Sequence, residues 1–167
     1  FTNVGAKVSV IPQELCELPF LRGYEDVDVL QILANKFVQR EYKVGDVIVE
    51  LGKPADSIGL IAHGKINKIG VGKYGDMTIL ETLADGDHYS WEAILETQDY
   101  WQFTAKAVTP AIVLTLQQSV FEEIVAQNES LKKHITAFQT RARNSKKDQT
   151  GEAAIELTAG QKGEYIL

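Results

Sequence analysis

The spacing of apolar residues changes along the chain, and this change separates a short helix from a series of strands. After Asp26, whose side chain suits an N-cap, apolar residues recur three and four positions apart, which predicts an amphipathic helix. These residues are Val27, Leu30, Leu33, Ala34 and Phe37. Further on, short apolar runs are bounded by glycine, proline and aspartate turns, which is typical of strands. We predict strands at 46–50, 58–62, 65–71, 77–83, 101–108 and 111–116. Short strands at this spacing indicate a closed or rolled sheet.

The segments that flank the predicted strands are expected to be packing elements. Residues 7–11 form an extended run that Pro12 ends, followed by the apolar group Leu15, Leu18, Phe20 and Leu21. The sequence from Ser119 to Glu122 has the form of a capping box and predicts a helix, whose buried face would contain Val120, Phe121, Ile124 and Val125. A second helix is expected from about Glu129 to about Ser145. We therefore divide the chain into a lead-in (1–23), one domain (24–145) and a linker or packing segment (146–167).

Composition limits the possible partners and the compartment. The chain has 167 residues, 44% of them apolar, which is enough for one real core. A net charge of −6 argues against a nucleic-acid partner, because binding phosphates requires clustered cations. The lone Cys16 suits a reducing, cytoplasmic location, and no apolar run approaches the length of a membrane span. Because the chain begins at Phe1 and its only methionine is Met77, we expect it to be a piece of a longer protein or a processed product.

No catalytic or metal site is predicted. The three histidines, His63, His88 and His134, have no ligand spacing with one another or with Cys16. The sequence Asp85-Gly86-Asp87 lacks the later ligand positions of a calcium loop and is interpreted as a turn. No serine, histidine and aspartate set can be placed on one site. We therefore expect no enzyme activity and no cofactor.

Glycine and apolar positions in the first half of the strand region resemble a known family. The relevant stretches are Tyr42–Ile48, Gly52, Pro54–Ile58 and Leu60–Ile66. They are similar to the cyclic-nucleotide-binding domain of the bacterial catabolite activator and of the regulatory subunits of the cAMP-dependent kinase. The resemblance covers about Phe37 to Phe138 and implies a mainly β fold with flanking helices, a cyclic-nucleotide-binding-like β-roll of the double-stranded jelly-roll type. Gly59 stands where the family commonly has an aromatic residue.

The ligand cassette of that family keeps its frame here but has two replaced side chains. The frame reads Tyr89, Ser90, Trp91, Glu92 and Ala93, and after a short helix Trp101, Gln102 and Phe103. The resemblance implies a glutamate for the ribose at the position of Trp91 and an arginine for the cyclic phosphate at the position of Trp101. Losing both partners costs about 4.5 to 8 kcal/mol, or roughly three to six orders of magnitude in affinity. Binding of cAMP or cGMP is therefore expected to be weak or absent.

The two tryptophans allow two interpretations. In the first, the indoles fold into the roll and close the pocket, with Tyr89 and Phe103 packed beside them. In the second, they line a pocket for a different small molecule, to which Gln102, Thr104 and the indole N–H groups offer directional contacts. Glu92 could also act as a shifted ribose ligand, and the amides near Ala93 could receive an anion. The second interpretation would make the chain a ligand sensor that regulates its host protein.

Three further stretches resemble a second family. They are residues 2–15, 61–70 and 151–157. They look like the inserted cyclic-nucleotide-binding-like domain of family 2B encapsulins, shell proteins with a phage-capsid-like fold that enclose a cargo enzyme. The resemblance implies an external domain of a nanocompartment, with the host shell protein and neighbouring subunits as partners.

Overall fold

The computed structural model describes residues 2–4, 7–89 and 100–158. The chain forms two compact units, Phe1–Lys132 and Lys133–Leu167. The first unit holds the lead-in, both sheets, helices α1 (Val27–Asn35) and α3 (Gln118–Gln127), and the first turn of α4 (Glu129–Thr158). The second unit holds the remainder of α4 (Glu129–Thr158).

The lead-in consists of short elements that precede the roll. Strands β1 (Thr2–Val4) and β2 (Lys7–Ser9) pair with each other, and two 3-10 turns follow, η1 (Pro12–Glu17) and η2 (Pro19–Leu21). Helix α1 (Val27–Asn35) begins as predicted, because the Asp26 side chain accepts a hydrogen bond from the Val29 amide. The apolar residues of the turns are buried together with one face of α1, and Phe20 makes an edge-to-face contact with Phe121 of α3. The predicted packing role of the lead-in is thus confirmed.

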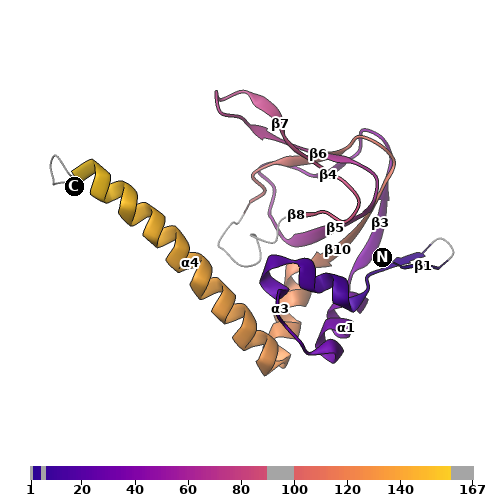
Figure 1. Cartoon of the computed structure of the whole chain (residues 1–167). Helices are drawn as coiled ribbons and strands as arrows, with labels where there is room; N and C mark the ends of the chain where they lie inside the picture. Colours follow the sequence, from indigo (N-terminus) through magenta and orange to yellow (C-terminus); the bar gives the residue numbers. More distant parts are fainter. Residues whose placement is uncertain (1, 5–6, 90–99, 159–167) are drawn as a thin grey trace. The chain divides into compact units, whose positions relative to one another are not determined.

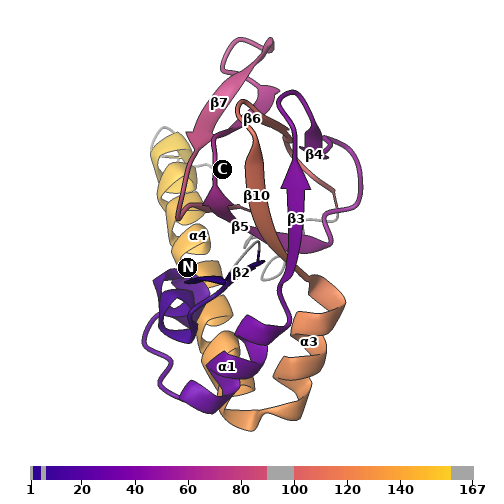
Figure 2. The same ribbon diagram turned by 90° about the vertical axis from the view of Figure 1, so that its right-hand side faces the viewer.

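Two antiparallel four-stranded sheets form the roll, with the strand orders β3-β10-β5-β8 and β4-β9-β6-β7. The strands are β3 (Val38–Tyr42), β4 (Val47–Val49), β5 (Ser57–His63), β6 (Ile66–Val71), β7 (Met77–Leu83), β8 (His88–Tyr89), β9 (Thr104–Ala107) and β10 (Ala111–Gln117). In Figures 1 and 2, α1 and α3 lie at one end of the roll, and the β6–β7 hairpin extends from the other. The predicted fold class, mainly β with flanking helices, is confirmed.

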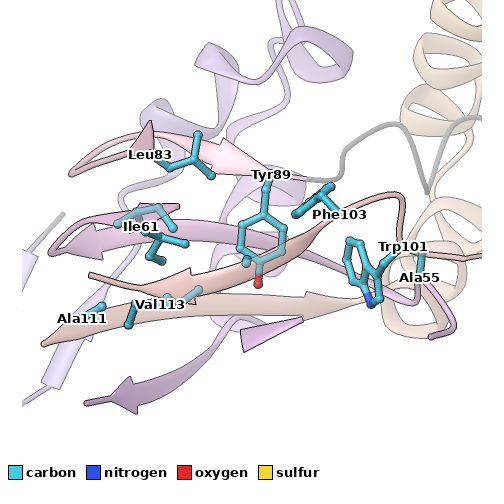
Figure 3. Packing of buried hydrophobic residues seen from close by; sticks show 11 residues of the cluster. Ala55, Ile61, Leu83, Tyr89, Trp101, Phe103, Ala111 and Val113 are labelled. Atoms are coloured by element: carbon cyan, nitrogen blue, oxygen red, sulfur yellow. The ribbon is translucent and has the colours of Figure 1, made fainter. Parts of the chain in front are cut away.

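The core of the roll lies between the two sheets. Ile61 and Val113 of one sheet meet Ile66 and Ala105 of the other, and Tyr89, Trp101 and Phe103 complete the cluster (Figure 3). The alternation of strand residues explains this arrangement, since every second side chain faces inward.

Two predicted element ends are wrong. The capping box at Ser119 does not form, because α3 (Gln118–Gln127) has Gln117 as its N-cap, two residues before Ser119, and has no side-chain cap. The backbone carbonyl of Asp56 accepts the Gln118 amide at 2.7 Å and so satisfies one of the exposed N–H groups of the first turn. Helix α4 runs to Thr158 instead of about Ser145. Its extension contains strong helix formers on both sides of Gly151, and they offset the cost of about 1 kcal/mol for one internal glycine.

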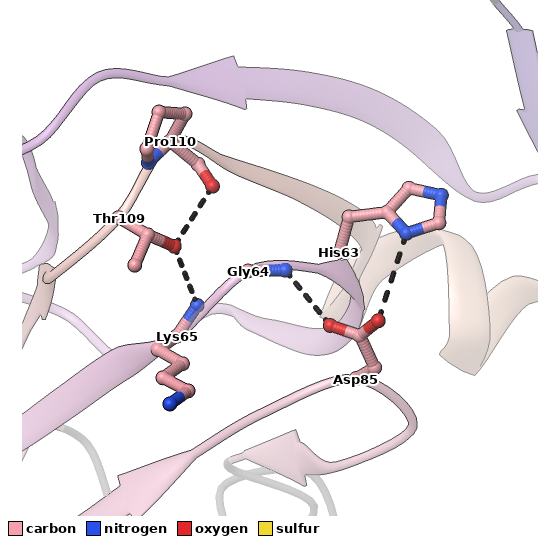
Figure 4. Close-up of polar contacts among 6 residues, drawn as sticks. All are labelled: His63, Gly64, Lys65, Asp85, Thr109 and Pro110. Carbon is pink, nitrogen blue, oxygen red and sulfur yellow. Dashed lines mark hydrogen bonds and ion pairs between the residues drawn. The ribbon is translucent and has the colours of Figure 1, made fainter.

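Gly64 occupies a corner of the roll that a side chain would obstruct (Figure 4). Its φ is +102°, and a Cβ there would lie 2.5 Å from the carbonyl oxygen of Pro110. The Gly64 amide donates to the Asp85 carboxylate at 2.8 Å, and the Lys65 amide donates to the Thr109 hydroxyl at 3.0 Å. The predicted need for glycine at this corner is therefore explained by both conformation and space.

Replacing Gly64 by alanine is expected to lower the free energy of unfolding by about 2 kcal/mol, from the left-handed backbone and the clash together. Gly75→Ala is the matched control, because Gly75 has a φ of +85° but nothing within 4 Å of an added Cβ. Gly75→Ala should lower the free energy of unfolding by about 1 kcal/mol, the contribution of the left-handed backbone alone. Urea unfolding of both variants measures the difference. Equal losses of unfolding free energy in the two variants would show that the clash with the Pro110 carbonyl adds nothing to the cost of Gly64→Ala.

Candidate functional site

The structure brings three of the predicted cassette residues together. Tyr89, Trp101 and Phe103 are buried, and their rings meet edge to face at centroid distances of 6.0 Å (Tyr89–Trp101), 6.4 Å (Tyr89–Phe103) and 5.7 Å (Trp101–Phe103). Gln102 is exposed, and its side-chain amide donates to the Tyr100 carbonyl. The remaining predicted positions, Ser90, Trp91, Glu92 and Ala93, lie outside the described residues.

Two hydrogen bonds hold the backbone of Trp101 in place. Its amide donates to the Lys53 carbonyl at 2.8 Å, and its carbonyl accepts from the Gly52 amide at 2.9 Å. The side chain is only 5% exposed. The Gly52–Lys53 turn therefore holds Trp101, whose indole is buried beside Tyr89 and Phe103 but also lines a cavity, so it does not close the pocket.

Tyr89 occupies space that Gly59 leaves open. The two residues are direct partners in the β5–β8 pairing, and a Cβ built on Gly59 would overlap the phenol ring. Tyr89 is 2% exposed. The absence of a side chain at Gly59 therefore leaves room for the Tyr89 ring, which covers this part of β5.

A cavity of about 320 Å³ adjoins the aromatic cluster. Its apolar lining comes from Tyr42, Ile48, Val49, Tyr89 and Trp101. Its polar lining comes from Arg40, Glu50, Lys53, Asp56, Ser57, Thr115 and Gln117. Gln102 and Thr104, the contacts predicted for a small-molecule ligand, do not line it; the Thr104 hydroxyl accepts from the Leu51 amide instead.

Sequence reasoning missed Arg40, because strand β3 itself was missed. Its sequence, Val-Gln-Arg-Glu-Tyr, contains too few apolar residues to stand out. The pairing with β10 shows what the strand does: Arg40 lies opposite Val113, and Tyr42 lies opposite Ala111. Directly opposed residues share one face of a sheet, and both β10 partners belong to the core. Arg40 is thus on the inward face of an edge strand. Arg40 and Tyr42 are two residues apart, and this strand-like spacing is the sequence pattern from which β3 could have been predicted.

Two polar side-chain groups at this cavity have no hydrogen-bond partner among the described residues. Neither the Tyr89 hydroxyl nor the Trp101 indole nitrogen takes part in a hydrogen bond with residues 2–4, 7–89 or 100–158, and the two atoms point the same way (Figure 3). Burial raises the pKa of the Tyr89 hydroxyl well above its ordinary value. Tyr42 and Asp56 raise the pKa further, whereas Arg40 lowers it. The hydroxyl is therefore a neutral hydrogen-bond donor at physiological pH, with charges of both signs nearby.

One lysine contacts the aromatic cluster directly. Lys68 of β6 places its ammonium 4.4 Å from the centroid of the Phe103 ring and 3.6 Å from a carboxylate oxygen of Glu81. This charge is thus engaged by a cation–π contact and an ion pair. It does not line the cavity beside Trp101.

The described residues contain neither a cluster of metal ligands nor a helix suited to span a membrane. No group of three or more histidine, cysteine, aspartate or glutamate residues is arranged to hold a metal. His63 lies 3.7 Å from the Asp85 carboxylate (Figure 4), and Cys16 is a free thiol. None of the described helices combines the length and apolar character needed to cross a bilayer.

Comparisons with known proteins agree on the fold. Among solved structures, the N-terminal domain of a transcriptional regulator from Streptomyces coelicolor A3(2) matches with a TM-score of 0.70 at 15% identity, covering 82% of this chain and 94% of that one. The sensor domain of the transcriptional regulator DNR from Pseudomonas aeruginosa gives 0.63 at 17% identity, with coverages of 81% and 90%. The Thermus thermophilus catabolite activator protein gives 0.59 at 19% identity, with coverages of 83% and 64%. No curated protein matches the sequence.

The family assignment comes from the sequence itself. Residues 39–128, more than half of the chain, match the family described as cyclic nucleotide-binding domain. The matched range contains β4 to β10, the aromatic cluster and all of the cavity lining. The chain therefore belongs to the cyclic nucleotide-binding domain family.

Proposed function

We propose that this chain is a non-catalytic regulatory member of its family whose cassette has lost the two side chains that hold a cyclic nucleotide. The position of Trp101 is the observation that supports this proposal most. By resemblance it is the place of the phosphate-binding arginine, and an indole offers a single N–H donor and no positive charge. The indole also packs against Tyr89 and Phe103, so the side chain at this position serves the aromatic cluster.

Two cations near the cluster, Lys68 and Arg40, are candidates to compensate for the missing arginine. Lys68 is held by Phe103 and Glu81, so recruiting it would break both contacts. Arg40 has no such contact among the described residues; it is an exposed residue of β3, in the other sheet from β6, and it lines the cavity. Neither replaces a cation at the Trp101 position.

Titration with cAMP and cGMP tests the proposal. We expect no saturable change in tryptophan fluorescence up to about 1 mM nucleotide, and no heat of binding by calorimetry, because the lost contacts place the dissociation constant in the millimolar range. The Arg40→Gln variant is measured in parallel. Saturable micromolar binding by the parent chain would contradict the proposal, and its loss in Arg40→Gln would identify the compensating cation.

A ligand sensor is the second candidate function. The cavity beside Trp101 favours it, since a lined hollow of about 320 Å³ lies within the range of small-molecule sites, roughly 300 to 1,000 Å³. In this function a ligand other than a cyclic nucleotide would regulate the host protein.

For the host we propose a cytoplasmic shell protein of the encapsulin type, on which this domain would lie externally and contact neighbouring subunits. The support is the sequence resemblance of residues 2–15, 61–70 and 151–157. The sequence of the parent chain tests this part: capsid-like segments around the domain would support it, and a helix-turn-helix after α4 would contradict it.

A further inference from the structure

The cavity beside Trp101 combines an apolar wall with charges of both signs. Tyr42, Ile48 and Val49 provide much of the wall, and the Tyr89 and Trp101 rings complete it. The polar part of the lining contains two cations, Arg40 and Lys53, and two anions, Glu50 and Asp56, so its formal charge is balanced. A balanced lining does not select a simple anion or a simple cation.

The unpartnered donors show where a ligand would have to supply acceptor atoms. Tyr89 and Trp101 line the cavity, and the hydroxyl of one and the indole N–H of the other have no hydrogen-bond partner among the described residues, so both can donate to a ligand. Arg40 is close enough to Tyr89 to lower the pKa of its hydroxyl. An oxyanion placed here would receive two neutral donors and one guanidinium, which is a favourable set for a carboxylate.

The Asp56 carboxylate indicates a second property of the ligand, a cationic group. This carboxylate lines the same cavity as Tyr89, Trp101 and Arg40, and it raises the pKa of the Tyr89 hydroxyl. Arg40 and Asp56 both line the cavity, and no ion pair within 4.0 Å joins them in the described structure. An anion alone would be repelled by Asp56 and Glu50, whereas a ligand that also carries a cationic group would pair with them.

We propose that this cavity binds a small zwitterion with an apolar or aromatic body, of the class of the free α-amino acids. The carboxylate is held by Arg40, the Tyr89 hydroxyl and the Trp101 indole N–H. The ammonium faces Asp56 and Glu50, and the side chain lies against Tyr42, Ile48 and Val49. The inference rests on the second candidate function, the ligand sensor, and names its site and ligand class.

Three probes with one common body test the charge requirement. They are L-phenylalanine, 3-phenylpropionate, which lacks the ammonium, and phenethylamine, which lacks the carboxylate. Titrations are followed by calorimetry and by the NMR signals of the protein at neutral pH. We expect L-phenylalanine to bind at least 10-fold more tightly than either singly charged probe, the fold-change expected for losing one charge-assisted hydrogen bond. Equal or tighter binding of 3-phenylpropionate, or no binding of any probe at 10 mM, would overturn the proposal.

Two conservative variants locate the site. Tyr89→Phe removes only the hydroxyl, and Arg40→Gln removes only the charge of an exposed residue, so both should fold. Each should weaken L-phenylalanine binding about 10-fold or more. Arg22→Gln is the matched control, because Arg22 is exposed after η2 and does not line the cavity. Unchanged binding in both variants would place any amino-acid binding elsewhere and reject this site.

The outcome is separable from that of the cyclic-nucleotide titration. L-Phenylalanine binding together with no cAMP binding supports both proposals. Binding of cAMP alone overturns the degenerate cassette and the zwitterion site, whereas binding of neither compound leaves the degenerate cassette standing and removes the zwitterion site.

Discussion

Alanine at position 59 is expected to lower the free energy of unfolding by about 3 kcal/mol, although it adds a single methyl group. The added Cβ would overlap the Tyr89 ring, and Tyr89 is itself enclosed by Trp101 and Phe103. The ring therefore cannot move aside without disturbing the core between the sheets. Thermal unfolding should show the loss as a decrease in Tm of about 6 to 12 °C for a chain of this size.

A double-mutant cycle identifies the cause of this loss. Tyr89→Leu alone should destabilise by removing part of a buried ring. In the Gly59→Ala/Tyr89→Leu pair the methyl group has room, so the combined loss should be smaller than the sum of the single losses by about 1 kcal/mol or more. Strict additivity would show that the cost at position 59 has nothing to do with Tyr89.

Trp101→Ala is expected to be the most damaging truncation in the aromatic cluster, at about 4 kcal/mol. The indole is almost fully buried and touches both Tyr89 and Phe103, so its removal leaves a hollow that the pinned backbone at Gly52 and Lys53 cannot close. Chemical denaturation measures the change in unfolding free energy.

Tyr100→Ala provides the control for that truncation, since Tyr100 is adjacent in sequence but 55% exposed. Its loss should stay within about 1 kcal/mol. A Trp101→Ala loss as small as that of the control would mean that the indole contributes little to the core. Position 101 would then be free to carry other side chains, and the structural interpretation of this tryptophan would be wrong.

The strands with strong apolar runs were predictable from the sequence, and those without them were not. The predicted runs at 58–62 and 111–116 correspond to β5 and β10, whose side chains are buried on both faces of the sheet. Strand β8 has two residues, and β3 is an edge strand of mainly polar composition, so neither carries a periodic signal. These two strands depend on partners that are distant in sequence.

The candidate site could be predicted in part. The cassette frame placed Tyr89, Trp101 and Phe103 correctly in one cluster, because the spacing of a family motif preserves its geometry. The cavity was not predicted, since its polar lining comes from separate segments, among them Arg40, Asp56 and Gln117, that meet only when the sheet forms. The capping box failed for a similar reason: a remote carbonyl, that of Asp56, supplied what the local sequence was expected to supply.

The hydrogen bond from the Gln118 amide to the Asp56 carbonyl has a mechanical consequence. Asp56 and Gln117, the residue that precedes α3, both belong to the cavity rim, so the rim and the first turn of α3 are joined by one short link. A ligand that moved Asp56 would therefore strain this hydrogen bond and, with it, the first turn of α3.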